Sequence, residues 1–278
     1  MMLVDSHCHL DQLDLTQDNE SLTSVLNEAW SEQIKHILSV GLDLVQSKKV
    51  INIASTYPNV SCSVGVHPTE SADESGVHYS VAQLEEKLIE LGSHSKVVAI
   101  GETGLDFYRD SNEETKKNQS DKFRAHIRAA KILKKPLIIH TRQAQNETLN
   151  IMAEENAAEI GGVMHCFTES LTMAQACMAM NFCISFSGIV TFKNAIDLQH
   201  LAQKIPLEKI LIETDAPYLA PMPFRGKTNR PSYVKYVAEK IAELRGDTLE
   251  SIAYNTTKNY FDLFYLSDRS VYVNVAQR

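Results

Sequence analysis

Two histidines near the N-terminus, His7 and His9, stand two residues apart in the segment Asp-Ser-His-Cys-His. On a β-strand, residues i and i+2 point to the same side, so both imidazoles could reach a single metal ion. Cys8 between them should then point away from that ion. A pair of half-buried histidines with ordinary hydrogen-bond partners is the alternative interpretation, and the motif alone does not separate the two.

Histidines also close two apolar segments further along the chain: His140 ends Pro-Leu-Ile-Ile-His, and His165 ends Gly-Gly-Val-Met-His. Burial of an imidazole without a polar partner is costly, and a metal ion would supply that partner. Either histidine alone is better explained as a hydrogen-bonded core residue. Together with His7 and His9 on one rim, they favour metal binding. Cys166, next to His165, should face the other side.

Carboxylates follow two more hydrophobic segments. Glu102 comes after Val-Val-Ala-Ile-Gly, and Asp215 comes after Ile-Leu-Ile-Glu-Thr. A carboxylate at the end of a buried strand must be paired, or its pKa rises. Four imidazoles and two carboxylates are too many for one open catalytic metal, and they suit two divalent ions bridged by a carboxylate. Imidazole ligands favour zinc, manganese or iron over magnesium.

The remaining histidines are interpreted differently. His67, in Gly-Val-His-Pro, is expected on the same rim but is surplus to the ligand set, so we predict that it binds substrate or supports a ligand. The others fall on helices, loops or strand starts and are expected to be structural or solvated: His36, His78, His94, His126 and His200.

Short apolar segments alternate with longer amphipathic segments along the whole chain. The predicted strands are Leu3–His9, His36–Val40, Ser61–His67, Val97–Gly101, Pro136–His140, Gly162–Cys166, Cys183–Ser187 and Ile210–Thr214. Helical segments between them include Asn19–Glu32, Val81–Leu91, Glu113–Leu133, Leu171–Met180 and Pro231–Leu244. Eight strand–helix units predict an α/β fold, a closed (β/α)8 TIM barrel, with an open doubly wound sheet as the competitor. Barrel enzymes build their active sites at the C-terminal ends of the strands, where the predicted ligands lie.

Composition limits the class of protein. The 278 residues are 44% hydrophobic and carry a formal net charge of −8, which argues against a broad basic surface for duplex DNA. The five cysteines form no CxxC pair, which favours a reducing compartment. We find no signal peptide and no apolar run long enough for a bilayer, so we expect a cytoplasmic protein without a membrane partner. We expect one domain over 1–264, a tail over 265–278, and a monomer by default.

Seven segments carry a family resemblance: Asp5–Asp11, Gly65–Pro68, Gly101–Asp106, Pro136–Arg142, His165–Phe167, Glu213–Tyr218 and Arg225–Lys227. In these segments the chain resembles the TatD family of metal-dependent deoxyribonucleases, within the amidohydrolase superfamily. The resemblance implies a TIM barrel and divalent-metal-dependent hydrolysis of phosphodiesters. The family is usually described as magnesium-dependent, so two ions of Mg, Mn or Zn are expected.

The resemblance also implies a division of the ligands. His7, His9 and Asp215 would hold one metal ion, His140 and His165 would hold the second, and Glu102 would bridge them. The two ions would activate a shared water, and Asp215 would orient that water and accept its proton. Glu102 and Asp215 are thus the predicted catalytic residues.

Substrate binding is assigned to the rim and to the loop after the last strand. Arg225 and Lys227 are expected to bind phosphate there, with a solvated loop as the alternative. Tyr218 is expected to stack on a base, with a packing role as the alternative. The family usually has Asn-Glu-Pro where this chain has Asn229-Arg230-Pro231. The extra positive charge of Arg230 either favours a phosphate or faces solvent. An acidic chain suits a substrate held locally, so the expected partner is DNA and the expected activity is a 3′-5′ exonuclease on single strands.

Two other functions stay open. A dinuclear amidohydrolase acting on a small amide, lactone or phosphoester would use the same ligands. Such enzymes often carry a carboxylated lysine as the bridge, whereas this chain places Glu102 at that position. A barrel that has lost its chemistry is the second alternative, and the intact ligand set argues against it.

Overall fold

The structure is a computed structural model that describes residues 2–264 except 17–19, 71, 74 and 109–111. Its strands form one sheet in which each strand pairs with the next along the chain, in parallel. Their bounds are Leu3–Cys8 (β1), Ile34–Val40 (β2), Val60–Val64 (β3), Val97–Asp106 (β4), Leu137–Arg142 (β5), Gly162–Met164 (β6), Phe182–Phe186 (β7) and Ile210–Ile212 (β8). A parallel bridge between Cys8 and Ala216 joins the end of β1 to the segment after β8. The predicted (β/α)8 TIM barrel is thereby confirmed.

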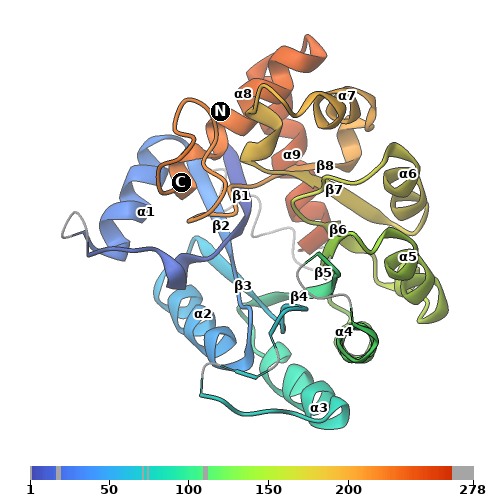
Figure 1. The fold of residues 1–278 in the computed structure, drawn as a ribbon. Coiled ribbons are helices and arrows are strands. Elements are labelled where there is room, and N and C mark those ends of the chain that lie inside the picture. Colours follow the sequence, from blue (N-terminus) through green and yellow to red (C-terminus); the bar gives the residue numbers. More distant parts are fainter. Residues whose placement is uncertain (1, 17–19, 71, 74, 109–111, 265–278) are drawn as a thin grey trace.

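Helices surround this ring of strands, as Figure 1 shows. Their bounds are Leu22–Ser31 (α1), Leu44–Thr56 (α2), Val81–Gly92 (α3), Glu113–Leu133 (α4), Gln145–Glu154 (α5), Leu171–Ala179 (α6), Ile196–Lys204 (α7), Val234–Arg245 (α8) and Leu249–Phe264 (α9). Pro231–Tyr233, predicted as the start of a helix, forms a separate 3-10 turn before α8. The predicted tail 265–278 lies outside the described residues, so the boundary at 264 stays a prediction.

Side-chain caps set where several helices begin. Ser21, Asp43, Ser80, Asn112 and Ser170 each accept a hydrogen bond from the backbone N–H three residues later. A side-chain oxygen at this position satisfies one of the N–H groups that the first helical turn leaves without a partner. The loops that precede these helices therefore end at defined residues.

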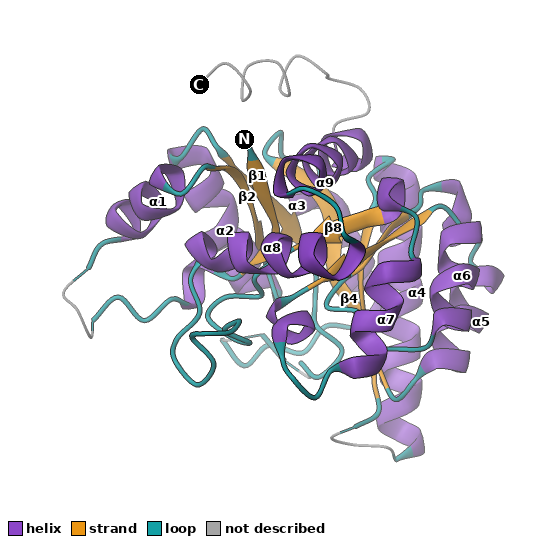
Figure 2. Ribbon diagram, turned by 90° about the horizontal axis from the view of Figure 1, so that it is seen from above, coloured by secondary structure: helices purple, strands orange, loops and turns teal. Residues whose placement is uncertain are grey.

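The last helix of the described residues, α9, closes the barrel at the N-terminal ends of the strands (Figure 2). Its buried aromatic residues Tyr260, Phe261 and Phe264 share one hydrophobic cluster with residues near the strand starts, among them Val4 and Ile138. Burial of such aromatic surface is a large favourable contribution to folding. The opposite end of the barrel is therefore left for a functional site. Within the described residues, no helix is long and apolar enough to cross a membrane.

The strand ends differ from the predicted ones in ways that matter for the site. β4 continues to Asp106, so Glu102 lies inside a strand that was predicted to end at Gly101. In contrast, β6 ends at Met164 and β8 at Ile212, so His165 and Asp215 lie on the segments that follow. The polar side chains thus come from both strands and first loop residues.

One glycine allows β4 and β5 to approach each other beside the predicted ligands. Gly104 pairs with His140 in the register of the two strands and has φ 136°. A Cβ atom at Gly104 would lie 1.9 Å from the carbonyl oxygen of His140. Only glycine fits this position, and its absence of a side chain brings together the strands that carry Glu102 and His140.

Candidate metal centre

A cleft of about 590 Å³ opens at the C-terminal ends of the strands. Seven of the predicted site residues line it: His9, His67, Glu102, His140, His165, Asp215 and Tyr218. His7 is fully buried, with its Nε2 atom 3.2 Å from Oε2 of Glu102. The six side chains predicted to bind metal therefore converge, although they come from five different strand regions.

The first group of potential ligands consists of His7, His9 and Asp215. The Nε2 atoms of the two histidines are 3.3 Å apart. Oδ1 of Asp215 lies 3.7 Å from Nε2 of His7 and 3.3 Å from Nε2 of His9. Neighbouring ligand atoms of a tetrahedral ion with bonds of about 2.1 Å are roughly 3.4 Å apart, so this triangle has the size of a metal site.

The second group surrounds Oε1 of Glu102. This atom lies 2.9 Å from Nε2 of His165 and 3.2 Å from Nδ1 of His140. The other carboxylate oxygen, Oε2, lies 3.2 Å from Nε2 of His7, in the first group. Each carboxylate oxygen thus faces a different set of imidazoles. A carboxylate that bridges two ions presents its oxygens in this way.

Hydrogen-bond acceptors on the far side from the cleft orient two of the rings. Nδ1 of His9 lies 3.2 Å from the carbonyl oxygen of Val40, and Nε2 of His140 lies 3.2 Å from Oδ2 of Asp106. These acceptors require a proton on the ring nitrogen that faces them. The other nitrogen of each neutral ring then presents a lone pair to the cleft, which is the arrangement that metal-binding histidines adopt.

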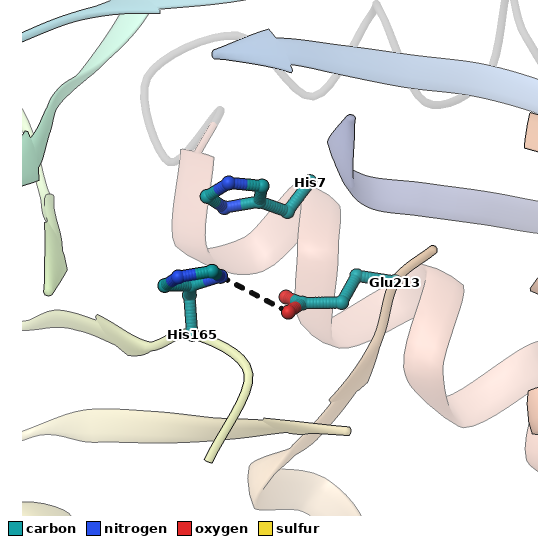
Figure 3. Close-up of side chains that lie close together, drawn as sticks. All are labelled: His7, His165 and Glu213. Atoms are coloured by element: carbon teal, nitrogen blue, oxygen red, sulfur yellow. Dashed lines mark hydrogen bonds and ion pairs between the residues drawn. The ribbon is translucent and has the colours of Figure 1, made fainter. Parts of the chain in front are cut away.

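His165 is oriented by Glu213, a fully buried carboxylate, as Figure 3 shows. Its Nδ1 atom lies 3.1 Å from Oε1 of Glu213, which also accepts the backbone N–H of Cys166 at 2.7 Å. Oε2 of Glu213 accepts the hydroxyl of Ser185 at 2.6 Å. The ring of His7 stacks on that of His165, with centroids 3.9 Å apart. Glu213 therefore fixes the ring that in turn supports His7.

His67 has the opposite proton arrangement. Its Nδ1 atom accepts the backbone N–H of Thr69 at 3.2 Å, so the neutral ring carries its proton on Nε2. Burial lowers the pKa of His67 to about 3, which keeps the ring neutral. Nε2 lies 3.5 Å from Oε1 of Glu102. His67 is thus a hydrogen-bond donor toward the cleft, unlike its neighbours.

The electrostatics of the centre follow from crowding of carboxylates and imidazoles. Burial opposes a charge on His165, but Glu102 and Glu213 raise its pKa well above the usual value. For His140, Asp106 and Glu102 likewise outweigh burial and raise the pKa. Burial would raise the pKa of Glu102, yet the surrounding histidines, His165 first, hold it well below its usual range.

These atoms fit divalent metal ions. Ring nitrogens of His9, His140 and His165 face carboxylate oxygens about 3 Å away, a spacing that requires a proton or a metal cation between the two atoms. The mixture of imidazole nitrogen and carboxylate oxygen suits Zn²⁺ or Mn²⁺ in particular. In the described part of the chain, Nδ1 of His7 has no hydrogen-bond partner, and the ring is held by stacking on His165 and by the contacts of its Nε2 atom.

A model of the family described as TatD related DNase matches residues 4–265. The chain belongs to the TatD family. Its relatives include the uncharacterized metal-dependent hydrolase YcfH of Escherichia coli K12, 44% identical over 266 residues that cover 96% of this chain and 97% of YcfH. The family resemblance predicted from the motifs is confirmed, and the chain is a metal-dependent hydrolase.

Two further relatives widen the comparison. The protein named 3′-5′ ssDNA/RNA exonuclease TatD of Escherichia fergusonii is 34% identical over 248 residues, which cover 87% of this chain and 92% of that relative. The crystal structure of YJJV, a TatD homologue from Escherichia coli K12, has a TM-score of 0.82 at 26% identity and covers 94% of this chain and 97% of its own.

In this TatD-family chain, the predicted phosphate-binding loop lies apart from the cleft lining. The Arg225 guanidinium stacks on Phe192, with its carbon 4.3 Å from the ring centroid, and the Lys227 ammonium lies 5.9 Å from the centroid of Phe224. Neither residue lines the cleft. Tyr218 does line it, is 51% exposed, and donates its hydroxyl proton to Gln12 at 2.7 Å.

The guanidinium of Arg230 forms ion pairs, and the residue does not line the cleft. Its guanidinium binds Oε2 of Glu20 at 2.6 Å and Oε2 of Glu28 at 2.8 Å. These glutamates lie just before and on α1. The departure from the family sequence at this position therefore ties the loop after β8 to α1, so Arg230 does not simply face solvent. Its role in phosphate binding stays a prediction.

The two cysteines beside predicted ligands behave differently. Cys8 packs in the hydrophobic core, as expected, with its thiol 3.8 Å from the carbonyl oxygen of Ala216. Cys166 lines the cleft together with His165, so the prediction that it faces away is wrong. The backbone at Cys166 has a left-handed φ of 43°, which breaks the strand alternation on which that prediction depended.

Three buried carboxylates were not predicted to take part. Asp106 and Glu213 orient His140 and His165 as described above. Asp5 accepts the backbone N–H of Thr214 at 2.8 Å and its hydroxyl at 2.5 Å, and burial raises the pKa of Asp5 to about 8. Glu213 directly follows the apolar run Ile210–Ile212 that precedes Asp215, and this position at the end of a buried strand could have indicated it.

Proposed function

We propose that this chain hydrolyses phosphodiester bonds of DNA, releasing nucleotides from the 3′ end of single strands at a dinuclear metal centre. His7, His9 and Asp215 would hold one ion, and His140 and His165 the other, with Glu102 between them. The observation that carries the proposal is that the two oxygens of Glu102 face these two groups separately. The name of the Escherichia fergusonii relative supports the choice of substrate.

The residues have separate tasks in this mechanism. When bound, two divalent ions would supply an activated water and would neutralise charge that develops on the phosphoryl oxygens. Burial would raise the pKa of Asp215, but the hydrogen bond with His9 and the nearby His165 and His7 hold it below its usual value. Asp215 is therefore ionised near neutral pH and can orient the attacking water and accept its proton.

His67 binds the substrate in this proposal. Its Nε2–H group points toward the centre from the wall of the cleft and is fixed by the hydrogen bonds of Nδ1 with Thr69. A neutral donor held in this way suits a phosphoryl oxygen. Tyr218 lines the cleft next to His9 and offers an exposed ring to a base. Arg225 and Lys227 would contact only the distal part of a bound strand.

The proposal is tested with metal-stripped protein and single-stranded DNA labelled at either end. Added Mg²⁺, Mn²⁺ or Zn²⁺ should restore stepwise shortening from the 3′ end, with less activity on duplex DNA. Glu102→Gln should reduce kcat by more than the roughly 10–100-fold loss typical of residues that only support a ligand. Glu90→Gln, an exposed carboxylate on α3, is the matched control and should retain full activity.

Two outcomes would contradict the proposal. Full activity of Glu102→Gln, with its fold intact by circular dichroism, would show that Glu102 does not act as a bridging carboxylate. Metal-stimulated turnover of a small lactone or amide, without any turnover of DNA or of bis-p-nitrophenyl phosphate, would instead favour the amidohydrolase alternative.

A further inference from the structure

An arginine and a tyrosine stack on each other at the edge of the cleft. The guanidinium carbon of Arg142, the last residue of β5, lies 3.7 Å from the centroid of the Tyr108 ring. Tyr108, two residues past β4, is 56% exposed. An aromatic ring with a guanidinium on its face, open to solvent, is the combination on which single-stranded nucleic acids stack their bases.

Arg142 differs in charge from the other residues around it. Among the described residues that line the cleft, it is the single lysine or arginine, whereas Glu70, Glu102, Asp106 and Asp215 contribute carboxylates. An anionic strand that enters an acidic cleft needs cations. The candidate metal centre would provide them at the scissile phosphate. Arg142 provides a permanent cation at the wall, with a planar group that can donate two hydrogen bonds to one phosphate.

The position of Arg142 relative to the centre is fixed by the strand. His140 and Arg142 are residues i and i+2 of β5, so their side chains leave the same side of the strand one pleat apart. Nδ1 of His140 contacts Oε1 of Glu102. The guanidinium therefore follows the candidate metal ligand outward along one wall of the cleft, next to the reacting bond and not at it.

Asp106 connects the stacked pair to the centre. Its Oδ2 atom contacts Nε2 of His140, while its Oδ1 atom accepts the backbone N–H of Tyr108 at 3.0 Å. The carbonyl oxygen of Arg142 accepts the backbone N–H of Phe107 at 3.0 Å. The backbone at both members of the pair is thus fixed relative to the metal-ligand side chains, which limits the ordering that a bound nucleotide would require.

We propose that Tyr108 and Arg142 form a subsite for a nucleotide that flanks the scissile phosphodiester. The base of that nucleotide extends the Tyr108–Arg142 stack, and the guanidinium N–H groups donate to its phosphate. This inference rests on the proposed function and extends it. The enzyme would select substrates in which a nucleotide next to the scissile bond can bind at the Tyr108–Arg142 pair. No base edge is read by such a stack, so the selection is for single-stranded nucleic acid without strong sequence preference.

Steady-state kinetics of the metal-loaded enzyme on two substrates test the subsite. Single-stranded DNA has a flanking nucleotide, whereas bis-p-nitrophenyl phosphate has none. Arg142→Ala and Tyr108→Leu should each raise KM for DNA by about tenfold, since stacking on one side chain contributes on that scale. Arg142→Ala should also reduce the slope of log(1/KM) against log salt concentration by about one, because one phosphate contact is lost. Kinetics on bis-p-nitrophenyl phosphate should not change.

Matched variants separate the subsite from general effects. Tyr108→Phe keeps the ring and should behave as the wild type. Arg128→Ala on α4 and Tyr254→Leu on α9 remove the same residue types outside the cleft and should leave KM unchanged. Circular dichroism and thermal unfolding of Arg142→Ala and Tyr108→Leu should match the wild type because both side chains are exposed.

Three results would overturn the inference. Unchanged KM for DNA in both variants would show that Tyr108 and Arg142 do not bind the substrate. An equal fall of kcat on both substrates would show that Arg142 acts through Asp106 and His140 and not on a nucleotide. A wild type that cleaves bis-p-nitrophenyl phosphate but not DNA would overturn the proposed function and the subsite together, and is recognised before any variant is made.

Discussion

Oδ2 of Asp106 lies 3.2 Å from Nε2 of His140, on the far side of the ring from Glu102. One imidazole is therefore held between two carboxylates, because its Nδ1 atom lies 3.2 Å from Oε1 of Glu102. The ring can donate only one proton while neutral, and Asp106 accepts it. Nδ1 then offers its lone pair to the cleft, and the added negative charge makes it a stronger ligand.

Replacement of Asp106 by Asn should therefore weaken metal binding. The amide keeps the size of the side chain but removes the charge, so we expect affinity for the ion held by His140 to fall by about 10–100-fold. Isothermal titration of metal-free protein with Mn²⁺ measures this. Asp121→Asn on the exposed side of α4 is the control. Equal affinities in the two variants would show that Asp106 does not act on the ligand.

Metal binding should release protons and should strengthen as the pH rises. Burial lowers the pKa values of His9, His140 and His165, but neighbouring carboxylates that share protons with these rings raise them by more. An ion must displace those protons, so the apparent Kd should fall by up to about tenfold per pH unit for each proton released. Titrations in buffers of different ionisation enthalpy count the protons. A Kd that is constant between about pH 6 and pH 8 would contradict this account.

Acid should destabilise the fold through His126. This buried ring accepts the N–H of Val66 at 2.9 Å and faces the carbonyl oxygen of Lys122 at 2.7 Å, and burial lowers its pKa to about 4. Because the folded-state pKa is below the unfolded value of 6.5, the stabilisation is complete above that value and is lost as the pH falls toward 4. The loss amounts to roughly 3 kcal/mol.

Urea unfolding of metal-free His126→Gln should then show a smaller difference between about pH 7 and pH 4 than the wild type does. The amide of glutamine does not titrate, which removes the contribution of this one side chain. His200→Gln, at an exposed position of α7, should keep the wild-type dependence. An identical pH dependence in all three proteins would show that His126 is not the source.

Arg230 should matter for stability and not for substrate. Its ion pairs with Glu20 and Glu28 are partly buried, so Arg230→Ala should lower the free energy of unfolding by about 1 kcal/mol. KM for single-stranded DNA should stay within about twofold of the wild type, since no phosphate contact is lost. A severalfold rise in KM at unchanged stability would restore the phosphate-binding interpretation of this departure from the family.

The barrel and the convergence of six side chains were predictable because both follow from simple periodicities. Parallel strands alternate with helices, and the carboxyl ends of such strands meet at one mouth, so Glu102 and His165 had to lie near each other. The family motifs added the division into two ligand groups. That division stays a prediction until an ion is counted at the site.

What the sequence left open depends on local backbone geometry and on proton positions. The left-handed turn at Cys166 reverses strand alternation, and no pattern of hydrophobic residues encodes it. The pairing of Asp106 with His140 depends on which nitrogen of the ring faces the strand. Arg230 was ambiguous because its glutamate partners are about 200 residues away in the chain and meet it only in the folded barrel.

The most direct test of the dinuclear centre is a count of tightly bound ions by Mn²⁺ titration of the metal-free protein, compared between wild type and Glu102→Gln. We predict two ions for the wild type and at most one for the variant, because each ion depends on its own oxygen of Glu102. Two ions of unchanged affinity in Glu102→Gln, or a single ion in the wild type, would contradict the account.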